Sequence, residues 1–449
     1  MQASSVPLTG ADCFLRAFDG EVRRLTGASH LSQLVLRLGP GFDPERLRAE
    51  LARATAIAPI LRAPIRRPRP FAVPVYDLER AAHAPPPTVE IAKDAAAPRA
   101  AGGVRPIPPL FFERLNDVRA IRRGELLRFD VVPYDGGAAG TDVAMTWLHM
   151  LFDGSGSEAF VRWLDARAQG EGEPAGLPGG DGLGDLTPPA LGAGRGRQAQ
   201  AWRAHMAGIG ARPPRSLAGP ARRVRQTLSY DLATFAPEET AAILARAKEK
   251  AGFLTPMLYY LAAAIRGHDA VFRARGVDAR SYVVPLPVNL RPKGGAGALF
   301  RTHVSMLWFH VPAELARDFD ALLEALKAQR RDSIKAGLVE GGIAAMDYAR
   351  FAPARLYAHM ARRTFGGELC SFFFAWTDHF LPGLTSFLGA PIENAFHAPS
   401  VPASPGSGAI LSVREGRLNL THVHQAGVTT AAEREILQRR IRDDLLGVA

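Results

Sequence analysis

The chain has 449 residues, of which 47% are hydrophobic and 22% are charged. This is the balance of a folded protein of two or three domains, and it excludes a disordered chain, a collagen-like chain and a small disulfide-stapled protein. Cys13 and Cys370 are the only cysteines, which excludes a four-cysteine zinc site and suits a reducing, cytoplasmic compartment. Residues 1–12 lack the apolar core of a secretory signal, and no run of about 18 uncharged apolar residues predicts a membrane-spanning helix.

The net charge of +11 is concentrated in one segment. Residues 195–225 contain eight arginines and no acidic residue, and so supply eight of the eleven net charges. Two interpretations stay open: a solvated linker, or a strip that docks an acidic partner such as a carrier protein, the phosphates of a coenzyme or an anionic lipid at a membrane surface. Nucleic acid is not an expected partner, because only Trp202 interrupts the arginines and no nucleic-acid-binding motif is present.

Strand and helix signals alternate in the N-terminal half. The pattern of His30–Leu38 is typical of a strand, and Asp43 and Pro44 then mark the start of a helix, because aspartate caps helices and proline fits the first turn. After Asp153, either Ser155 or Ser157 is predicted to cap another helix. Two further strands are expected at Leu126–Val132 and Asp142–Leu148.

The middle of the chain is rich in glycine and proline. Residues 171–197 have almost no apolar periodicity and cannot bury enough surface to offset their ordering entropy. Together with the arginines that follow, they predict a crossover linker. We therefore expect an N-terminal unit, a linker and a C-terminal unit at residues 1–168, 169–225 and 226–449.

The C-terminal half alternates in the same way. Pro237 opens a helix that Gly252 closes, and a strongly apolar helix starts at Pro256. The prolines within Tyr282–Leu290 favour an edge strand or a bulge. Other strands are expected at His303–Val311, Cys370–Trp376, Ala409–Val413 and Arg417–His424, and other helices at Glu314–Lys335 and Thr430–Leu446. Strands and helices mixed in both units predict an α/β (α+β) fold of two sandwiches.

The sharpest local motif is the stretch from His149 to Gly154, which has the pattern H-x-x-x-D-G. It places an imidazole at the end of a strand and a carboxylate in the turn that follows. A histidine near its ordinary pKa of about 6.5 is suited to general-base catalysis at neutral pH. A structural histidine beside a helix-capping aspartate fits the same spacing, so the motif by itself leaves both interpretations open.

Three more segments accompany this motif in a fixed order: Leu31–Ile65, Val283–Pro292 and Phe387–Val428. Together, the four segments resemble the chloramphenicol acetyltransferase-like superfamily. That group includes condensation domains of peptide synthetases, polyketide-associated acyltransferases, plant-type hydroxycinnamoyl transferases and wax ester synthase-like enzymes. The resemblance spans nearly the whole chain and implies two sandwich subdomains with an active-site tunnel between them. Leu148 stands where many members have a first histidine.

The resemblance implies a role for each motif residue. His149 would be the general base, and Asp153 would be structural, pairing with Arg291 across the two halves. Gly154 would allow close backbone packing beside the tunnel. The oxyanion donor stays open among the side chains of Ser305, Thr302 and Thr377, a water molecule and a backbone N–H.

The resemblance implies acyl transfer from a thioester to an alcohol or amine acceptor. The donor would be acyl-CoA or a phosphopantetheine-bound acyl group on a carrier protein, with no bound cofactor. The closing region favours an alcohol acceptor, and so ester formation. Two alternatives stay open: a free-standing condensation enzyme that forms amides, and a catalytically silent module that binds carrier proteins.

No metal site is predicted. His422 and His424 share one face of a predicted strand, but the sequence shows no third ligand for them. The sequence therefore does not offer the ligands that a metal-dependent hydrolase needs.

Overall fold

Two sheets organise the computed structural model, which describes residues 4–93, 105–170, 191–220, 222–291 and 299–448. The first sheet has six strands in the order β12-β13-β2-β7-β6-β5. Their bounds are Ser386–Phe387, Ala390–Pro399, Leu31–Leu38, Thr141–Leu148, Leu127–Pro133 and Thr88–Ile91. A separate small sheet in the N-terminal half has the order β1-β4-β3, with bounds Ser5–Pro7, Val75–Asp77 and Ile65–Arg66. The strands predicted near residues 31, 127 and 142 are confirmed.

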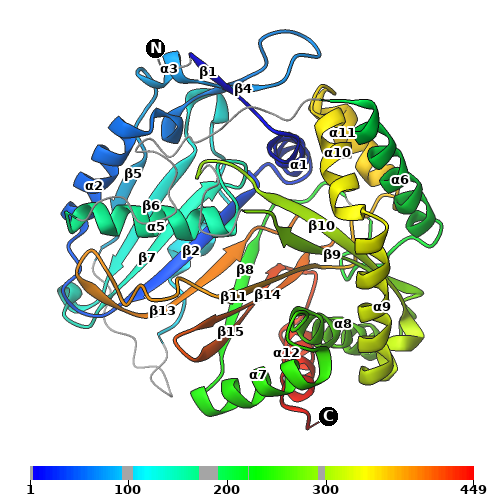
Figure 1. The fold of residues 1–449 in the computed structure, drawn as a ribbon. Coiled ribbons are helices and arrows are strands. Elements are labelled where there is room, and N and C mark those ends of the chain that lie inside the picture. Colours follow the sequence, from blue (N-terminus) through cyan, green and yellow to red (C-terminus); the bar gives the residue numbers. More distant parts are fainter. Residues whose placement is uncertain (1–3, 94–104, 171–190, 221, 292–298, 449) are drawn as a thin grey trace.

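Helices α2 (Pro44–Ile57) and α5 (Gly154–Ala168) cover one face of the first sheet (Figure 1). The predicted start of α2 is confirmed, since Asp43 Oδ1 accepts a hydrogen bond from the Glu45 N–H at 2.9 Å and Pro44 is the first helical residue. Leucines at helical spacing then enter the core: Leu47 and Leu51 join Leu34 of β2 and Phe160 of α5 in one buried cluster.

The second sheet has the order β11-β14-β15-β8, with bounds Phe373–His379, Ser407–Arg414, Arg417–Gln425 and Leu228–Thr234. Its core contacts are with α7 (Pro237–Ala251), α8 (Met257–Ala274) and α12 (Ala431–Leu446). A separate hairpin, β9 (Ser281–Asn289) and β10 (Val304–Pro312), meets the region before β11 where the Ser371 N–H donates to the Val283 carbonyl at 2.7 Å. Pro285 and Pro287 thus lie on a strand with only one full partner, as expected for prolines.

Helix α9 is shorter than the sequence predicts. The segment expected as one helix from Glu314 to Lys335 is a 3₁₀ turn, Ala313–Arg317, followed by α9, Phe319–Lys335. Asp318 separates them, because its Oδ1 accepts the Ala321 N–H at 2.9 Å and so caps a new helix.

The two halves of the chain exchange elements. Strand β13, from the C-terminal half, pairs antiparallel with β2 over the register from Leu38 with Ile392 to Ser32 with Pro399, and so extends the N-terminal sheet (Figure 1). In the other direction, α1 (Gly10–Thr26) packs against α10 (Leu338–Ala349) and α11 (Ala354–Arg363). Membership of the sheets therefore does not follow the expected division at residue 226.

Part of the expected linker is a helix. Helix α6 (Ala193–Gly210) buries Ala199, Met206 and Ile209 and packs along α10. A Cβ added to Gly341 of α10 would lie 2.9 Å from the Gln198 carbonyl oxygen, so glycine permits this close approach. Tertiary packing therefore stabilises a helix that the Gly-rich sequence does not predict by itself. Residues 171–190 of the expected linker lie outside the described residues.

The remaining described helices are short. They are α3 (Leu78–Ala81), beside β4, and α4 (Pro109–Leu115), which packs near β2, β7 and β8.

Candidate active site

His149 directly follows β7, where the chain leaves the sheet beside the start of β2. Leu148 pairs with Leu31, and the His149 N–H donates to the His30 carbonyl at 3.3 Å. This register stacks the two imidazoles, with ring centroids 5.3 Å apart and planes 9° from parallel. Phe18 of α1 packs edge-on against the ring of His30, with the two ring centroids 4.6 Å apart. His30 is therefore a buried neighbour of His149 that comes from a different strand.

The environment of His149 favours its neutral form. Burial lowers the pKa of His149 below its ordinary value, and the carboxylate of Asp153 opposes this shift. Burial, followed by the charge of His149, holds the pKa of His30 well below the ordinary range. Within the described residues, Nδ1 of His149 is buried without a hydrogen-bond partner, and Nε2 accepts no hydrogen bond from a described group. Nε2 is thus the nitrogen that can accept a proton from a substrate.

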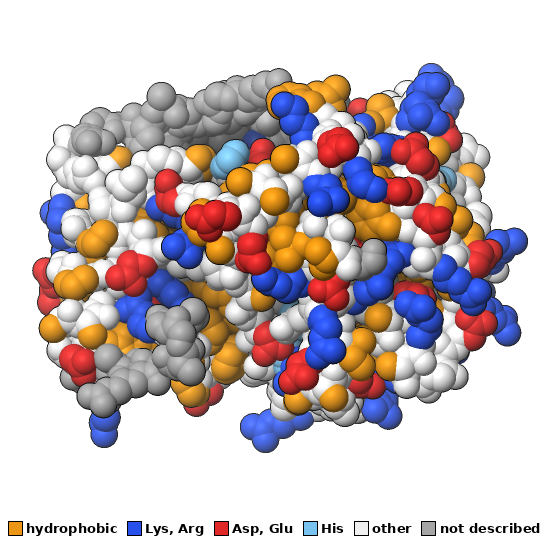
Figure 2. Space-filling view, turned by 90° about the horizontal axis from the view of Figure 1, so that it is seen from below, with side chains coloured by type: hydrophobic (Ala, Val, Ile, Leu, Met, Phe, Trp, Pro, Cys, Tyr) orange, Lys and Arg blue, Asp and Glu red, His pale blue; other side chains and the backbone are white. Residues whose placement is uncertain are grey.

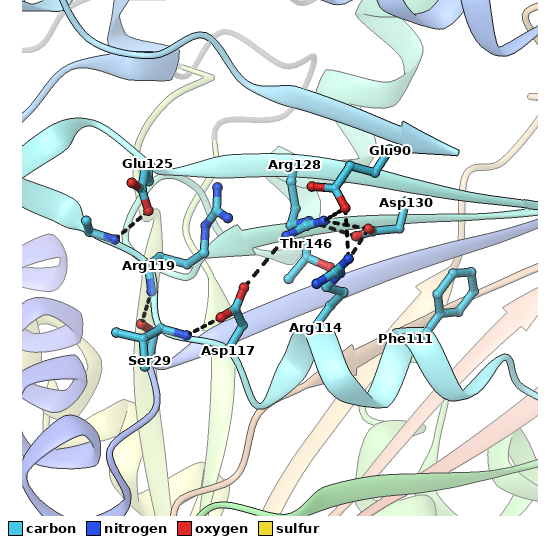
Figure 3. Close-up of polar contacts among 12 residues, drawn as sticks. Ser29, Glu90, Phe111, Arg114, Asp117, Arg119, Glu125, Arg128, Asp130 and Thr146 are labelled. Atoms are coloured by element: carbon cyan, nitrogen blue, oxygen red, sulfur yellow. Dashed lines mark hydrogen bonds and ion pairs between the residues drawn. The ribbon is translucent and has the colours of Figure 1, made fainter. Parts of the chain in front are cut away.

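A layer of charged groups fixes the turn that carries His30. The Ser29 N–H donates to the Asp117 carbonyl at 3.0 Å, and Ser29 Oγ accepts from the Arg119 N–H at 2.8 Å (Figure 3). Further along the same layer, Arg128 pairs with Asp130 at 2.7 Å. Glu90 and Arg114 complete the group, which spans β5, β6 and α4. Arg128 also lies 3.7 Å from the Asp117 carboxylate, which connects these ion pairs to the turn. The two Ser29 contacts, together with the His30 N–H that donates to Asp19 Oδ1 at 2.8 Å, hold His30 where its ring can stack on His149.

Asp153 is the N-cap of α5, not Ser155 or Ser157 as the sequence predicts. Its backbone is extended, and its Oδ1 accepts the Gly156 N–H at 2.7 Å. Ser157 lies within the first turn instead and donates to the Gly154 carbonyl at 2.6 Å. Aspartate caps helices as well as serine does, so the earlier residue starts the helix.

The predicted ion pair between Asp153 and Arg291 is present. Nη2 and Nε of Arg291 lie 3.1 and 3.2 Å from Asp153 Oδ1; the Asp153 side chain is buried and that of Arg291 is only 12% exposed. The second carboxylate oxygen accepts the His303 N–H at 2.7 Å. Arg291 also donates to the carbonyl of Arg301 at 3.1 Å. Asp153 therefore links α5 to Arg291, just after β9, and to His303, just before β10.

Two glycines in the first turn of α5 make close approaches. A Cβ on Gly154 would lie 3.2 Å from Cε1 of His397, whereas a Cβ on Gly156 would lie only 2.6 Å from Arg291 Nη2. Gly154 therefore permits close packing of α5 against β13. Gly156, which the sequence analysis did not single out, is the glycine that the ion pair requires.

His397 is the third histidine of this region and was not predicted. It lies on β13, and its Nε2 is 2.9 Å from Ser157 Oγ. Burial, followed by the charge of His149, lowers the pKa of His397 to about 3. No local sequence signal could have placed it here, because β13 reaches this sheet only by pairing with the distant β2.

Solved structures with a similar fold match nearly the whole chain. The first condensation domain of the CDA synthetase matches with a TM-score of 0.67 and 16% identity over 99% of this chain and 96% of that one. TRI3 trichothecene 15-O-acetyltransferase from Fusarium sporotrichioides matches with a TM-score of 0.68 and 13% identity over 98% and 94% of the two chains. Polyketide synthase associated protein 5 from Mycobacterium tuberculosis matches with a TM-score of 0.60 and 14% identity over 99% of each chain. The chain has the chloramphenicol acetyltransferase-like fold. Neither protein-family models nor curated proteins match it.

The three candidate oxyanion donors occupy different places in this fold. Ser305 Oγ donates to the Val339 carbonyl at 2.9 Å, so the hydroxyl is turned toward α10. Thr302 is buried, its N–H donates to Asp12 Oδ1 at 3.1 Å, and its Oγ1 has no partner among the described residues. Thr377 is half-buried on β11, on the strand face of Phe373, which packs against the N-terminal core. All three stay candidates, and the hydroxyls of Thr377 and Thr302 are the two that form no hydrogen bond with a described residue.

Two further observations bear on the site. Across the described ranges, no group of three His, Cys, Asp or Glu side chains could hold a metal ion. A cavity of about 340 Å³ lies at the start of α12, lined among others by Arg222 and Arg275, and it does not include His149. The active-site tunnel therefore stays a prediction.

No helix in the described part of the chain is long and apolar enough to cross a membrane.

Proposed function

We propose that this protein is an acyltransferase that moves an acyl group from a CoA or carrier-protein thioester to a hydroxyl group, with His149 as general base. The observation that carries the proposal is the state of His149: a lowered pKa and an unbonded Nε2, with the neighbouring carboxylate committed to Arg291. A neutral imidazole of this kind can accept a proton throughout the neutral pH range. Matches to condensation domains and to an O-acetyltransferase support acyl transfer as the reaction class.

The proposed reaction has two proton movements. His149 Nε2 takes the proton of the acceptor hydroxyl as its oxygen attacks the thioester carbonyl. The resulting imidazolium then returns the proton to the thiolate as the C–S bond breaks. No acyl-enzyme forms, so no nucleophilic serine or cysteine is needed, and both cysteines are buried.

Thr377 and Thr302 are the proposed side-chain sources of oxyanion stabilisation. The hydroxyl of Thr377 shares the strand face of Phe373, and the unpaired Oγ1 of Thr302 lies one residue before His303, which bonds Asp153. Removing one such donor typically lowers kcat by 10²–10³-fold. Separate valine variants at these two positions distinguish them.

Amide formation is the second candidate, because the matching structures include condensation domains as well as the O-acetyltransferase. The same base can deprotonate an attacking amine. We keep ester formation as the first candidate on the resemblance of residues 387–428 to wax ester synthase-like enzymes. The acceptor panel in the experiment must therefore contain both alcohols and amines.

The experiment measures free thiol released from acetyl-CoA and octanoyl-CoA with each acceptor, confirmed by mass spectrometry of the product. His149→Ala should lower turnover by roughly 10²–10⁴-fold while the thermal unfolding profile is retained. The wild-type rate should be almost flat above pH 6.5 and fall only at lower pH, because the pKa of His149 is lowered.

The matched control is His83→Ala, which removes an exposed histidine far from the motif in sequence. It should keep wild-type turnover. Near-wild-type turnover of the folded His149→Ala variant would discard the mechanism. Product formation only with amines would replace ester formation by amide formation.

A further inference from the structure

Helix α6 packs along α10, and its C-terminal end meets that of α11 on the outer side of the C-terminal half (Figure 1). At their contact, a Cβ on Gly210 would lie 2.3 Å from the Thr364 carbonyl oxygen. Two segments that are far apart in sequence, 191–220 and 350–367, form this region, and neither contains an aspartate or a glutamate. We name their solvent-facing side the α6–α11 surface.

Five arginines are exposed on this surface: Arg197, Arg203, Arg212, Arg355 and Arg363. None of the five makes an ion pair or a side-chain hydrogen bond with any described residue. Two carboxylates on neighbouring helices are already committed, since Asp347 of α10 pairs with Arg195 and Glu21 of α1 pairs with Arg362 and Arg24. The positive charge of the surface is therefore not neutralised within the described residues.

Two apolar side chains are exposed among these arginines. Leu356 is 49% exposed and Met360 is 51% exposed. Because residues four apart share one side of a helix, Leu356 lies above Met360, next to the row formed by Arg355 and Arg363. The outer side of α11 therefore combines basic and apolar groups, while its inner side packs Tyr357 against Phe14 of α1 at 6.0 Å.

The opposite arrangement is found on the face formed by α7 and α12. There, basic and acidic side chains are interspersed (Figure 2) and pair with one another. Arg442 pairs with Glu239, and Arg440 lies 3.0 Å from Asp444. On that face several basic side chains are thus neutralised by acidic neighbours, whereas the two segments of the α6–α11 surface contain no acidic residue.

We propose that the α6–α11 surface binds an anionic lipid surface. Guanidinium groups pair with lipid phosphates, and a basic helix with apolar side chains on the same side lies in the plane of the headgroups with those side chains inserted. A fluid array of headgroups satisfies long, exposed arginines without a fixed geometry. An acidic protein fits less well, because protein interfaces rely on aromatic anchors and α6 and α11 expose no Trp or Phe.

The test is co-sedimentation of the full chain with vesicles of phosphatidylglycerol and, separately, of phosphatidylcholine. We expect binding to the anionic vesicles only, with release on raising the salt from 0.1 to 0.5 M. Arg355→Gln with Arg363→Gln should weaken binding about 25-fold, at about fivefold for each arginine. Leu356→Ser with Met360→Ser should weaken it roughly tenfold.

Matched controls separate this surface from general charge. Lys248→Gln with Arg439→Gln removes two exposed charges from α7 and α12, and Phe253→Ser with Leu254→Ser removes an apolar pair that is more exposed, at 77% and 76%. Both should bind like the wild type. Equal losses in test and control variants would overturn the proposal, as would binding to an apo acyl carrier protein without binding to vesicles. All variants should keep wild-type transfer from soluble acetyl-CoA, so failure of lipid binding is distinguishable from failure of the proposed enzymatic function.

Discussion

The ion pair between Asp153 and Arg291 can be tested by removing its charge without removing the helix cap. Asparagine at position 153 keeps an oxygen that can accept the Gly156 N–H, so α5 remains capped. What is lost is the negative charge opposite a guanidinium group whose side chain is only 12% exposed. Stranding a buried charge costs about 3–5 kcal/mol.

The lower end of that range is expected here. Arg291 keeps the Arg301 carbonyl as an acceptor, and the asparagine oxygen can still accept one of its N–H groups. We therefore expect Asp153→Asn to lower the free energy of unfolding by about 3 kcal/mol. Arg291→Met should cost a similar amount, because it leaves the carboxylate with only backbone donors. Total stabilities are about 5–15 kcal/mol, so each loss is large.

The assay is urea unfolding of the two single variants and the double variant, followed by tryptophan fluorescence. The double variant should be less destabilised than the sum of the single variants, with a coupling energy of about 2 kcal/mol. Asp320→Asn, at the exposed pair with Lys250, is the control and should cost less than about 1 kcal/mol. A coupling energy below about 0.5 kcal/mol would refute the reasoning, because that is the value for independent sites.

Two further predictions concern α5 itself. Burial raises the pKa of Glu158 to about 8, whereas its unfolded value is about 4.3, so the free energy of unfolding should decrease as pH rises between these values. Glu158→Gln should abolish that decrease, so at pH 9 the variant should be more stable than the wild type. Parallel profiles of the free energy of unfolding against pH for the two proteins would contradict this. Gly156→Ala should cost about 1–3 kcal/mol in thermal unfolding, because its Cβ meets Arg291, and should also lower turnover. Gly20→Ala, within α1 and with no atom within 4 Å of the added Cβ, should instead stabilise by about 0.5–1 kcal/mol; equal effects of the two alanines would exclude the close approach as the cause.

Elements with local signals are those that the sequence predicts well. Helix α2 begins where Asp43 and Pro44 place it, and α7 ends at Gly252 as expected. Both signals act within one turn of the helix, so no distant contact is needed to interpret them. Helix α1 carries a comparable signal that was overlooked, the capping box of Thr9 and Asp12.

Elements that depend on distant partners could not be predicted. Helix α6 is stabilised by its packing against α10, and β13 by pairing with β2. The candidate site divides in the same way. The motif and the family resemblance identify His149, Asp153 and Arg291, which the fold brings to one region. His30 and His397 reach the same region only through strand register, which is a property of the assembled sheet.

The exchange of β13 has a consequence for how this chain is made. During synthesis β2 emerges early, but its partner β13 follows roughly 350 residues later, or about 20–70 s at ordinary rates of translation. Every residue of β2 is buried in the finished protein, so for that interval an apolar strand has an unpaired edge open to other chains. The nascent N-terminal half is thus the part most exposed to aggregation, and its sheet is complete only after nearly nine-tenths of the chain has left the ribosome.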